Sequence, residues 1–324
     1  MHTIEEYRTL FISYLKEKVR TKEPKNLYAP ITYIMELGGK RLRPVLTLMT
    51  TEIFGTNYKK ALDAAAAVEI FHNFSLVHDD IMDAAPLRRG KKTVHKKWDV
   101  NTGILSGDAM LITAYQFFET YEDAIFKDLA KIFSTTALQV CEGQQYDIDF
   151  ESRDLVTIPE YLKMIEYKTA VLVAGAMKMG AIIAKAPKES QNVIYEFGKN
   201  LGIAFQLQDD YLDAFGDPKT FGKQVGGDII ENKKTFLFIK AMEMATTEQC
   251  QELGHLFSIQ PNDSEPKVTT VKQIFKESGA AELARKEIEN YTNKAFSILD
   301  SISIDLDKKQ ILLDFGKGLM NRSV

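Results

Sequence analysis

The chain has 324 residues, of which 45% are hydrophobic and 27% are charged, and its 41 basic and 45 acidic residues give a formal net charge of −4. This balance is typical of a globular protein and excludes a disordered or fibrous chain. Because nucleic-acid-binding proteins usually carry a clear excess of positive charge, the slight acidity also argues against a nucleic-acid partner.

The predicted elements are helices from the start of the chain. Residues 1–19 form an amphipathic pattern with many charges and without the apolar centre of a signal peptide. In residues 60–83 apolar side chains recur at three- and four-residue spacing, and residues 87–158 contain no proline. The most apolar segment, 170–184, is interrupted by Lys178 and is shorter than the ~20 residues that cross a bilayer. We therefore expect helices and no membrane-spanning segment.

Glycine and proline residues divide these runs into separate helices. We find no strand alternation, no alternation of strands with helices, and no long linker. The sequence therefore predicts an all-α fold, a bundle of about ten or more helices in a single domain over residues 1–324. The predicted breaks lie at 38–39, 86, 89–90, 159, 186–187, 216–218, 226–227 and 258–267.

The two cysteines, Cys141 and Cys250, are too few for a disulfide framework and do not have the spacing of metal ligands. We expect both to be buried, reduced thiols, which is consistent with a cytoplasmic protein.

An acidic pattern, DDxxD, occurs at residues 79–83 and again at 209–213, both times in a helical context. The first and last carboxylates of each copy lie one helical turn apart on the same face, where they repel each other unless a cation lies between them. Oxygen ligands without cysteine or histidine favour Mg²⁺. A single copy could equally be a solvated helix end, but two copies among apolar residues predict a metal site. Its candidate ligands are Asp79, Asp80, Asp83, Asp209, Asp210 and Asp213.

Basic residues gather beside the predicted helix breaks, in GGKRLRP at 38–44, RRG at 88–90, KT at 168–169 and GKQVGGDIIENKKT at 222–235. Each cluster alone would be read as solvated surface. Together with the acidic motifs, they predict a metal-bridged diphosphate on one side and a metal-free anion pocket on the other. His72 lies two turns before Asp79, where it is either a packed core residue or a third donor beside Lys40 and Arg43.

These motifs, in this order and spacing, resemble the trans-isoprenyl diphosphate synthases, the family of farnesyl and geranylgeranyl diphosphate synthases. The resemblance covers about residues 27 to 240. It implies the isoprenoid synthase fold, with helices around a central cavity, usually in a homodimer. It also implies the head-to-tail condensation of an allylic diphosphate (dimethylallyl, geranyl or farnesyl) with isopentenyl diphosphate. The implied cofactor is Mg²⁺, about three ions per active site, which Mn²⁺ can replace.

The resemblance also implies roles for single residues. Mg²⁺ on the allylic diphosphate would be held by Asp79, Asp83 and Asp209, with support from Asp80, Asp210 and Asp213. The same diphosphate would contact Arg88, Lys168 and Lys223, with Lys233 nearby. Isopentenyl diphosphate would be bound by Lys40, Arg43, His72 and Arg89. Thr169 and Gln206 would place their dipoles against the developing allylic cation.

The residues before the first acidic motif bear on product length. Phe74 and Ser75 lie about 6–7.5 Å along the helix axis from Asp79, and Phe71 lies a further turn away. An aromatic ring at Phe74 would form the floor of the cavity, while Ser75 leaves room beneath Asp79. In family terms this pattern implies a short-chain product, C15 to C20, with C20 favoured. The alternative is that Phe74 only packs against a neighbouring helix.

Two other functions share part of this pattern. A class I terpene cyclase also ionises an allylic diphosphate, but it needs no second diphosphate pocket and normally has a different second metal motif. A non-catalytic regulatory subunit of a prenyltransferase typically loses one acidic motif, and this chain has both. The chain ends MNRSV, whereas some family members carry a more basic tail over the site, and Arg322 is the candidate for that position.

Overall fold

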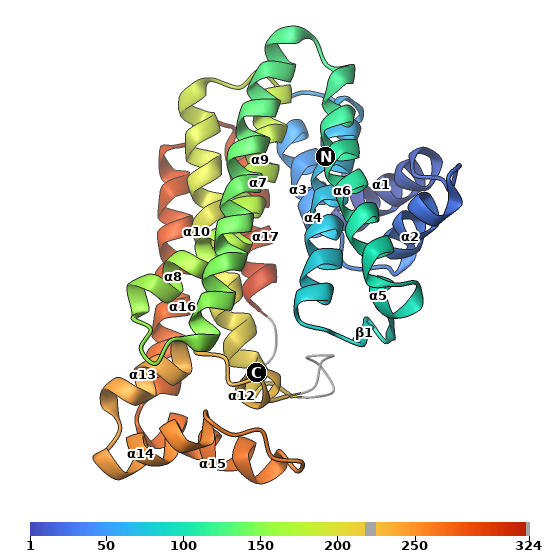
Figure 1. The fold of residues 1–324 in the computed structure, drawn as a ribbon. Coiled ribbons are helices and arrows are strands. Elements are labelled where there is room, and N and C mark those ends of the chain that lie inside the picture. Colours follow the sequence, from blue (N-terminus) through green and yellow to red (C-terminus); the bar gives the residue numbers. More distant parts are fainter. Residues whose placement is uncertain (218–224, 322–324) are drawn as a thin grey trace. The chain divides into compact units, whose positions relative to one another are not determined.

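The computed structural model describes residues 1–217 and 225–321, so Lys223 and Arg322 lie outside the described residues. Within these ranges nearly all regular structure is helical, which confirms the predicted all-α class (Figure 1). None of the described helices is both long and apolar enough to cross a membrane. The longer helices are α1 (Ile4–Lys18), α2 (Lys25–Glu36), α3 (Leu42–Ile53), α4 (Leu62–Met82), α6 (Val100–Gln116), α7 (Asp123–Ser152), α8 (Ile158–Ile165), α9 (Val171–Ile183), α10 (Lys188–Phe215), α13 (Phe236–Met244), α14 (Thr247–Leu256), α15 (Glu265–Glu277), α16 (Ala280–Ile298) and α17 (Leu306–Met320).

Short elements join these helices. Two single-turn helices, α5 (Val94–Lys97) and α12 (Gly227–Ile230), follow the two acidic motifs in the sequence. A π-helix over Glu166–Ala170 connects α8 to α9. The remaining short helices are of the 3-10 type, at Tyr58–Ala61, Phe117–Thr120 and Leu299–Ser301.

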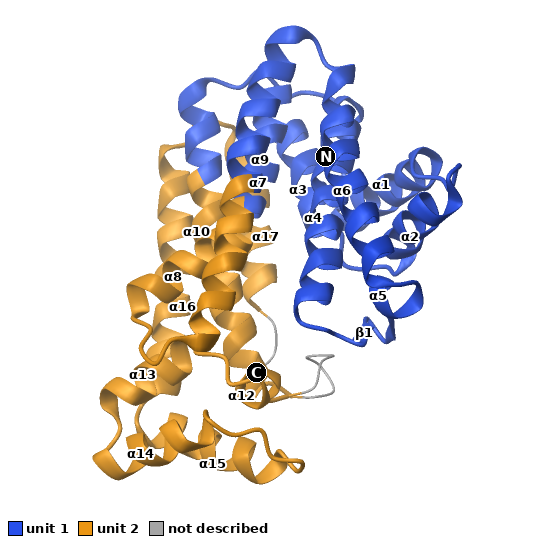
Figure 2. Cartoon of the chain, viewed as in Figure 1, with its two compact units in different colours: residues 1–137, 172–195 blue, residues 138–171, 196–324 orange. Residues whose placement is uncertain are grey.

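The chain forms two compact units, coloured separately in Figure 2. Unit 1 comprises residues 1–137 and 172–195, and unit 2 comprises residues 138–171 and 196–324. The first acidic motif lies in unit 1 and the second in unit 2, so each unit carries part of the predicted site. The expectation of a single domain over residues 1–324 stays a prediction.

In unit 1, α4 packs against α3 and α6 (Figure 1). The small side chains of residues 64–67 on α4 are fully buried, which allows neighbouring helices to come close. Further along α4, the ring of Phe71 packs edge-on against Phe133 at 5.2 Å between centroids, and Phe118 packs against Phe133 at 5.1 Å. This aromatic cluster lies about two turns before the acidic end of α4.

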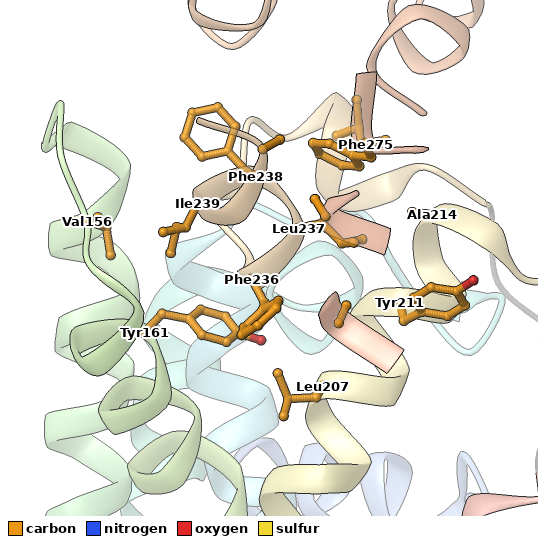
Figure 3. Packing of buried hydrophobic residues seen from close by; sticks show 14 of the residues in the cluster. Val156, Tyr161, Leu207, Tyr211, Ala214, Phe236, Leu237, Phe238, Ile239 and Phe275 are labelled. Atoms are coloured by element: carbon orange, nitrogen blue, oxygen red, sulfur yellow. The ribbon is translucent and has the colours of Figure 1, made fainter. Parts of the chain in front are cut away.

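In unit 2, one apolar core joins α8, α10, α13 and α15. Figure 3 shows the side chains that meet there, with Tyr161 from α8 pointing toward Phe236 of α13, near Leu207 of α10. The Tyr161 ring is fully buried and its centroid lies 6.3 Å from that of Phe236. This core holds α10, and with it the second acidic motif, in place.

The structure differs from the sequence expectations in a short antiparallel ribbon, β1 (Leu87–Arg88) with β2 (Lys91–Lys92). Arg89 and Gly90 between them have φ of 52° and 73°, the positive values that a tight two-residue hairpin turn of type I′ requires. Alternation cannot be recognised over strands of two residues, although the break at 89–90 was predicted.

The predicted burial of both cysteines is wrong. Cys141 is exposed and Cys250 is half-buried, and both are free thiols. Cys141 lies on the outward side of α7, because its predecessor Val140 is the residue that points into the core.

Candidate active site

The first acidic motif occupies the end of α4, where its three carboxylates differ in their surroundings. Asp83 directly follows the last helical residue and is exposed, and its N–H donates to the Asp79 carbonyl at 2.9 Å. Asp80 is only 1% exposed, and both of its oxygens accept hydrogen bonds from Arg88 Nε at 2.9 Å. Arg88 Nη2 also lies 3.5 Å from Asp79 Oδ2. Asp80 therefore positions Arg88 beside Asp79.

The pKa of the Asp80 carboxyl is raised by its burial, although the hydrogen bonds and the charge of Arg88 lower it in part. Asp80 follows Asp79 on the helix and points about 100° away from it, toward the interior, where Arg88 contacts it. Its role as a metal ligand stays a prediction.

The tight turn at residues 89–90 sends the two neighbouring arginines in different directions. Arg88 pairs with the aspartates of α4, while Arg89 Nη1 donates to the carbonyl of Gly38. A Cβ atom at Gly39 would lie 2.8 Å from Arg89 Nη2, and Gly39 also has a φ of +122°. Only glycine fits this position without displacing the guanidinium.

Near this loop, Arg43 Nη1 and His72 Nε2 form a hydrogen bond of 3.1 Å. Burial and the positive charges of Arg43 and Arg89 hold the pKa of His72 well below its usual range, so its ring is neutral at neutral pH. Its Nε2 therefore accepts from Arg43. The structure thus brings Arg43, His72, Arg89 and the loop before the exposed Lys40 together in unit 1.

The loop itself is fixed by a buried ion pair that was not predicted from the sequence. Arg41 is in the left-handed region at φ 51°, and its guanidinium pairs with Glu69 and donates to the Met35 carbonyl. Asn73 Nδ2 donates to Glu69 Oε1 at 3.0 Å. A lone acidic residue in the apolar run AAAAVEIF was the signal that could have pointed to this pair.

The residues predicted to set product length lie on α4 in unit 1. Phe74 is 8% exposed and packs between Phe71 and His78, with centroid distances of 5.5 Å and 4.8 Å. The Ser75 hydroxyl donates to the His72 carbonyl of its own helix at 2.8 Å. Phe74 therefore continues the aromatic cluster of unit 1 toward the acidic end of the helix.

In unit 2, the π-helix carries Lys168 and Thr169. Lys168 Nζ pairs with Asp147 Oδ2 of α7 at 2.6 Å. A Cβ at Gly143 of α7 would lie 2.2 Å from the Lys168 nitrogen, so only glycine lets the two backbones come this close. Single turns of π-helix are frequent at functional sites, because they turn side chains out of the α-helical register.

The second acidic motif lies on α10 and repeats the arrangement of the first. Asp209 and Asp213 are half-buried, whereas Asp210 is buried and accepts hydrogen bonds from Tyr161 Oη at 2.5 Å and Gln206 Nε2 at 2.7 Å. Burial raises the Asp210 pKa to about 6. Asp210, like Asp80, is thus held by protein groups, and the role of both as metal ligands stays a prediction.

Next to Asp210 lies a small cavity of about 110 Å³, lined among others by Lys168, Thr169, Gln206 and Lys233. Burial lowers the pKa of Lys233, but Glu231, Asp147 and Asp228 outweigh it and raise the value. Burial and the charges of Asp210 and Asp213 raise the pKa of Asp228 well above its usual range. Asp147, Tyr161 and Asp228 were not predicted from the sequence, because their contacts with the motif residues are long-range and leave no local pattern.

The acidic residues fit Mg²⁺ by their chemistry. Among the described residues, no three His, Cys, Asp or Glu side chains are grouped closely enough to hold a metal alone. The outer aspartates of each motif lie about one turn apart, Asp79 with Asp83 at the C-terminal end of α4 and Asp209 with Asp213 on α10, and each pair would supply oxygen donors. Mg²⁺ is typically bound by one or two carboxylates together with substrate phosphates and water.

The chain is similar to known proteins of one enzyme family. The model of the polyprenyl synthetase family matches residues 24–277. A geranylgeranyl diphosphate synthase from Methanosarcina mazei is 41% identical over 231 residues, 71% of each chain. A geranylgeranyl pyrophosphate synthase from Geoglobus acetivorans is 35% identical over 311 residues, 95% of this chain and 94% of that one.

A crystal structure of a geranylgeranyl pyrophosphate synthase superposes on all of both chains with a TM-score of 0.96 and 55% identity. The predicted isoprenoid synthase fold is thereby confirmed. Enzymes of this kind use Mg²⁺ and take isopentenyl diphosphate and an allylic diphosphate as substrates. The chain belongs to the polyprenyl synthetase family of trans-prenyltransferases.

Proposed function

We propose that this enzyme condenses an allylic diphosphate with isopentenyl diphosphate, head to tail, and releases geranylgeranyl diphosphate as its main product. The observation that carries the proposal is the divergence of Arg88 and Arg89 in unit 1. One arginine stands beside the carboxylates of the acidic motif, and the other stands at the loop near Arg43 and His72. Two separate anion sites suit a reaction between two diphosphates.

This division favours a synthase over a class I terpene cyclase, which binds a single diphosphate. The aspartates at the end of α4 stand with Arg88, whereas the group of Arg43, His72 and Arg89 is made of two guanidinium groups and a neutral imidazole. It therefore suits an anion bound without metal, as the diphosphate of isopentenyl diphosphate would be. Both acidic motifs are present, which argues against a silent regulatory subunit.

The outer aspartates Asp79, Asp83 and Asp209 would hold Mg²⁺, about three ions per active site, with Mn²⁺ as a substitute. When bound, Mg²⁺ neutralises the charge of the diphosphate leaving group. Asp80 and Asp210 would act through their protein partners. Asp213, whose Oδ2 accepts from the Asp228 N–H at 3.0 Å, would order the end of α10.

Cationic side chains would complete the allylic diphosphate site. Arg88 is oriented by Asp80 and Lys168 by Asp147, so each would bind phosphate oxygens in a fixed direction. Lys233 would add a charge from the neighbouring loop, and Lys223 remains a candidate from the sequence. Thr169 and Gln206 would turn their oxygen dipoles toward the allylic cation, in a cavity that must exclude water.

The two units would work as one catalytic domain, and the enzyme would act as a homodimer in the cytoplasm. An exposed apolar face on α6 supports the dimer. Ile104, Leu105 and Ile112 are 42%, 60% and 60% exposed, and their spacing places them on one side of the helix. Apolar side chains grouped on one face are typical of an interface covered by a second copy.

Replacing both Leu105 and Ile112 by glutamate is expected to convert the dimer into a monomer, because four charges would be buried in the interface of two copies. Light scattering after size-exclusion chromatography would measure the mass. The control carries Leu306→Glu, the same kind of change at an apolar side chain that is 81% exposed and lies outside α6. A double variant with the wild-type mass would contradict this interface.

The reaction is tested with labelled isopentenyl diphosphate, each allylic starter in turn and Mg²⁺, with product length read by chromatography. We expect elongation to a C20 product. Failure to elongate any starter would contradict the proposal, and a cyclic hydrocarbon formed from the allylic diphosphate alone would support the cyclase.

Replacing Phe74 by alanine is expected to shift the main product to longer chains, because it removes the ring that closes the space beyond Ser75. The ring lies one turn from the acidic end of α4 and is in contact with Phe71. Chromatography at saturating substrate gives the product distribution. Phe118→Leu, a change in the same aromatic cluster further from the motif, is the control. An unchanged distribution would mean that Phe74 serves only in packing.

A further inference from the structure

Four side chains of unit 2 form one connected chain of hydrogen bonds along the small cavity. Tyr161 Oη donates to Asp210 Oδ2 at 2.5 Å, and Gln206 Nε2 donates to Asp210 Oδ1 at 2.7 Å. Thr169 Oγ1 donates to Gln206 Oε1 at 3.1 Å. Gln206 and Asp210 lie one turn apart on α10, Tyr161 comes from α8 and Thr169 from the π-helix, and all four line the cavity.

The direction of these hydrogen bonds is set at the Asp210 end. One donor faces each oxygen of Asp210, Tyr161 Oη at Oδ2 and Gln206 Nε2 at Oδ1. The Gln206 amide therefore presents its NH₂ group to Asp210 and its carbonyl oxygen to Thr169. A phenol keeps its proton at neutral pH, so Tyr161 is the donor in its hydrogen bond to Asp210.

We propose that Tyr161 and Asp210 are positioning residues that fix the hydrogen-bond polarity of Thr169. The Thr169 hydroxyl donates its proton to Gln206, so towards the cavity its Oγ1 can act only as an acceptor through its lone pairs. The partial negative charge of the Thr169 oxygen stabilises a cation in the cavity, whereas a hydroxyl proton pointing into the cavity would destabilise that cation. The inference rests on the proposed roles of Thr169 and Gln206 beside the allylic cation.

The Tyr161 ring is fully buried against Phe236 in the apolar core (Figure 3). Its hydroxyl donates to Asp210 and also meets the backbone of Phe236. A buried carboxylate, moreover, carries a desolvation cost that an apolar side chain would avoid. Both polar groups therefore have a directional role, which is to hold Gln206 in one of its two amide orientations.

The first test is the variant Asp210→Asn, which keeps the size of the side chain but lets its NH₂ group face Gln206. The Gln206 amide can then turn over and donate to Thr169. We expect kcat to fall about tenfold to a hundredfold, because one fixed dipole at the cation is reversed. KM for isopentenyl diphosphate should stay within about twofold, because Arg43 and His72 are not altered. Tyr161→Phe should reduce kcat less, about threefold to tenfold, because it removes one of the two hydrogen bonds that hold Asp210 but leaves Gln206 donating to Asp210.

The decisive variant exchanges the two groups, Gln206→Glu with Asp210→Asn. The carboxylate at position 206 then accepts from Thr169 and from the amide NH₂ group at position 210. The amide oxygen at position 210 accepts from Tyr161, so the original polarity of Thr169 returns. We expect the double variant to be at least about tenfold faster in kcat than either single variant. A double variant no faster than the slower single variant would overturn the inference, because a purely structural role predicts accumulated damage.

Thr169→Val separates this inference from the proposed roles on which it rests. A slow Thr169→Val enzyme with a wild-type rate for Asp210→Asn would overturn the polarity inference alone. A Thr169→Val enzyme as fast as wild type would overturn the role of Thr169 and the inference with it. Wild-type protein that elongates no allylic starter would instead contradict the proposed function. If Asp210→Asn does not fold, the kcat of Tyr161→Phe is measured in its place, and a wild-type kcat would contradict the role of Tyr161.

Discussion

Replacing Asp79 by asparagine is expected to lower kcat for condensation about a thousandfold, which corresponds to about 4 kcal/mol of lost transition-state stabilisation. Asparagine keeps the shape of the side chain but not the charge that would hold Mg²⁺ at the acidic end of α4. Because the residues proposed to bind isopentenyl diphosphate lie elsewhere in unit 1, KM for that substrate should change little. Elongation of labelled isopentenyl diphosphate at increasing Mg²⁺ concentrations measures both effects.

The matched control is Asp123→Asn in the first turn of α7. Asp123 is exposed. It belongs to the same unit and loses the same charge, so it should retain the wild-type rate. An Asp79→Asn enzyme that keeps more than about a tenth of wild-type kcat at high Mg²⁺ would show that Asp79 is not a metal ligand.

Asp79 and Asp80 differ in how far their surroundings could be predicted from the sequence. The DDxxD spacing correctly indicated that residues four apart share a helix face, and the outer aspartates do lie on the more accessible side. The spacing does not reveal what meets the middle aspartate. Asp80 is bound by Arg88 only because a two-residue turn folds β2 back on β1, and Asp210 is bound by Tyr161 because α8 and α10 share a core.

The helical class and the helix breaks were predictable from the sequence because they depend on local periodicity and on glycine and proline. The loop of Gly38 and Gly39 lies between α2 and α3 as expected. The π-helix at Lys168 was not predictable, because it arises from the close approach of α7 at Gly143. Tertiary contacts of this kind are absent from a single sequence.

The buried pair of Arg41 and Glu69 gives the largest expected effect on stability. Glu69→Leu removes one partner and leaves the guanidinium of Arg41 buried without its counter-charge, because the two side chains are only 4% and 3% exposed. Breaking a buried ion pair in this way costs about 3–5 kcal/mol. Urea unfolding followed by circular dichroism should show this loss as a large fall in the midpoint.

Arg41→Met together with Glu69→Leu replaces the pair by apolar side chains and should recover most of the lost stability, because no buried charge is left unpaired. Although its stability is restored, this double variant should bind isopentenyl diphosphate more weakly than the wild-type enzyme. Arg41 ties the loop to the Met35 carbonyl, and this loop carries Lys40 and receives Arg89 at Gly38. We therefore expect KM for isopentenyl diphosphate to rise about tenfold, with KM for the allylic substrate nearly unchanged. A stable double variant with wild-type KM for both substrates would limit the pair to a role in folding.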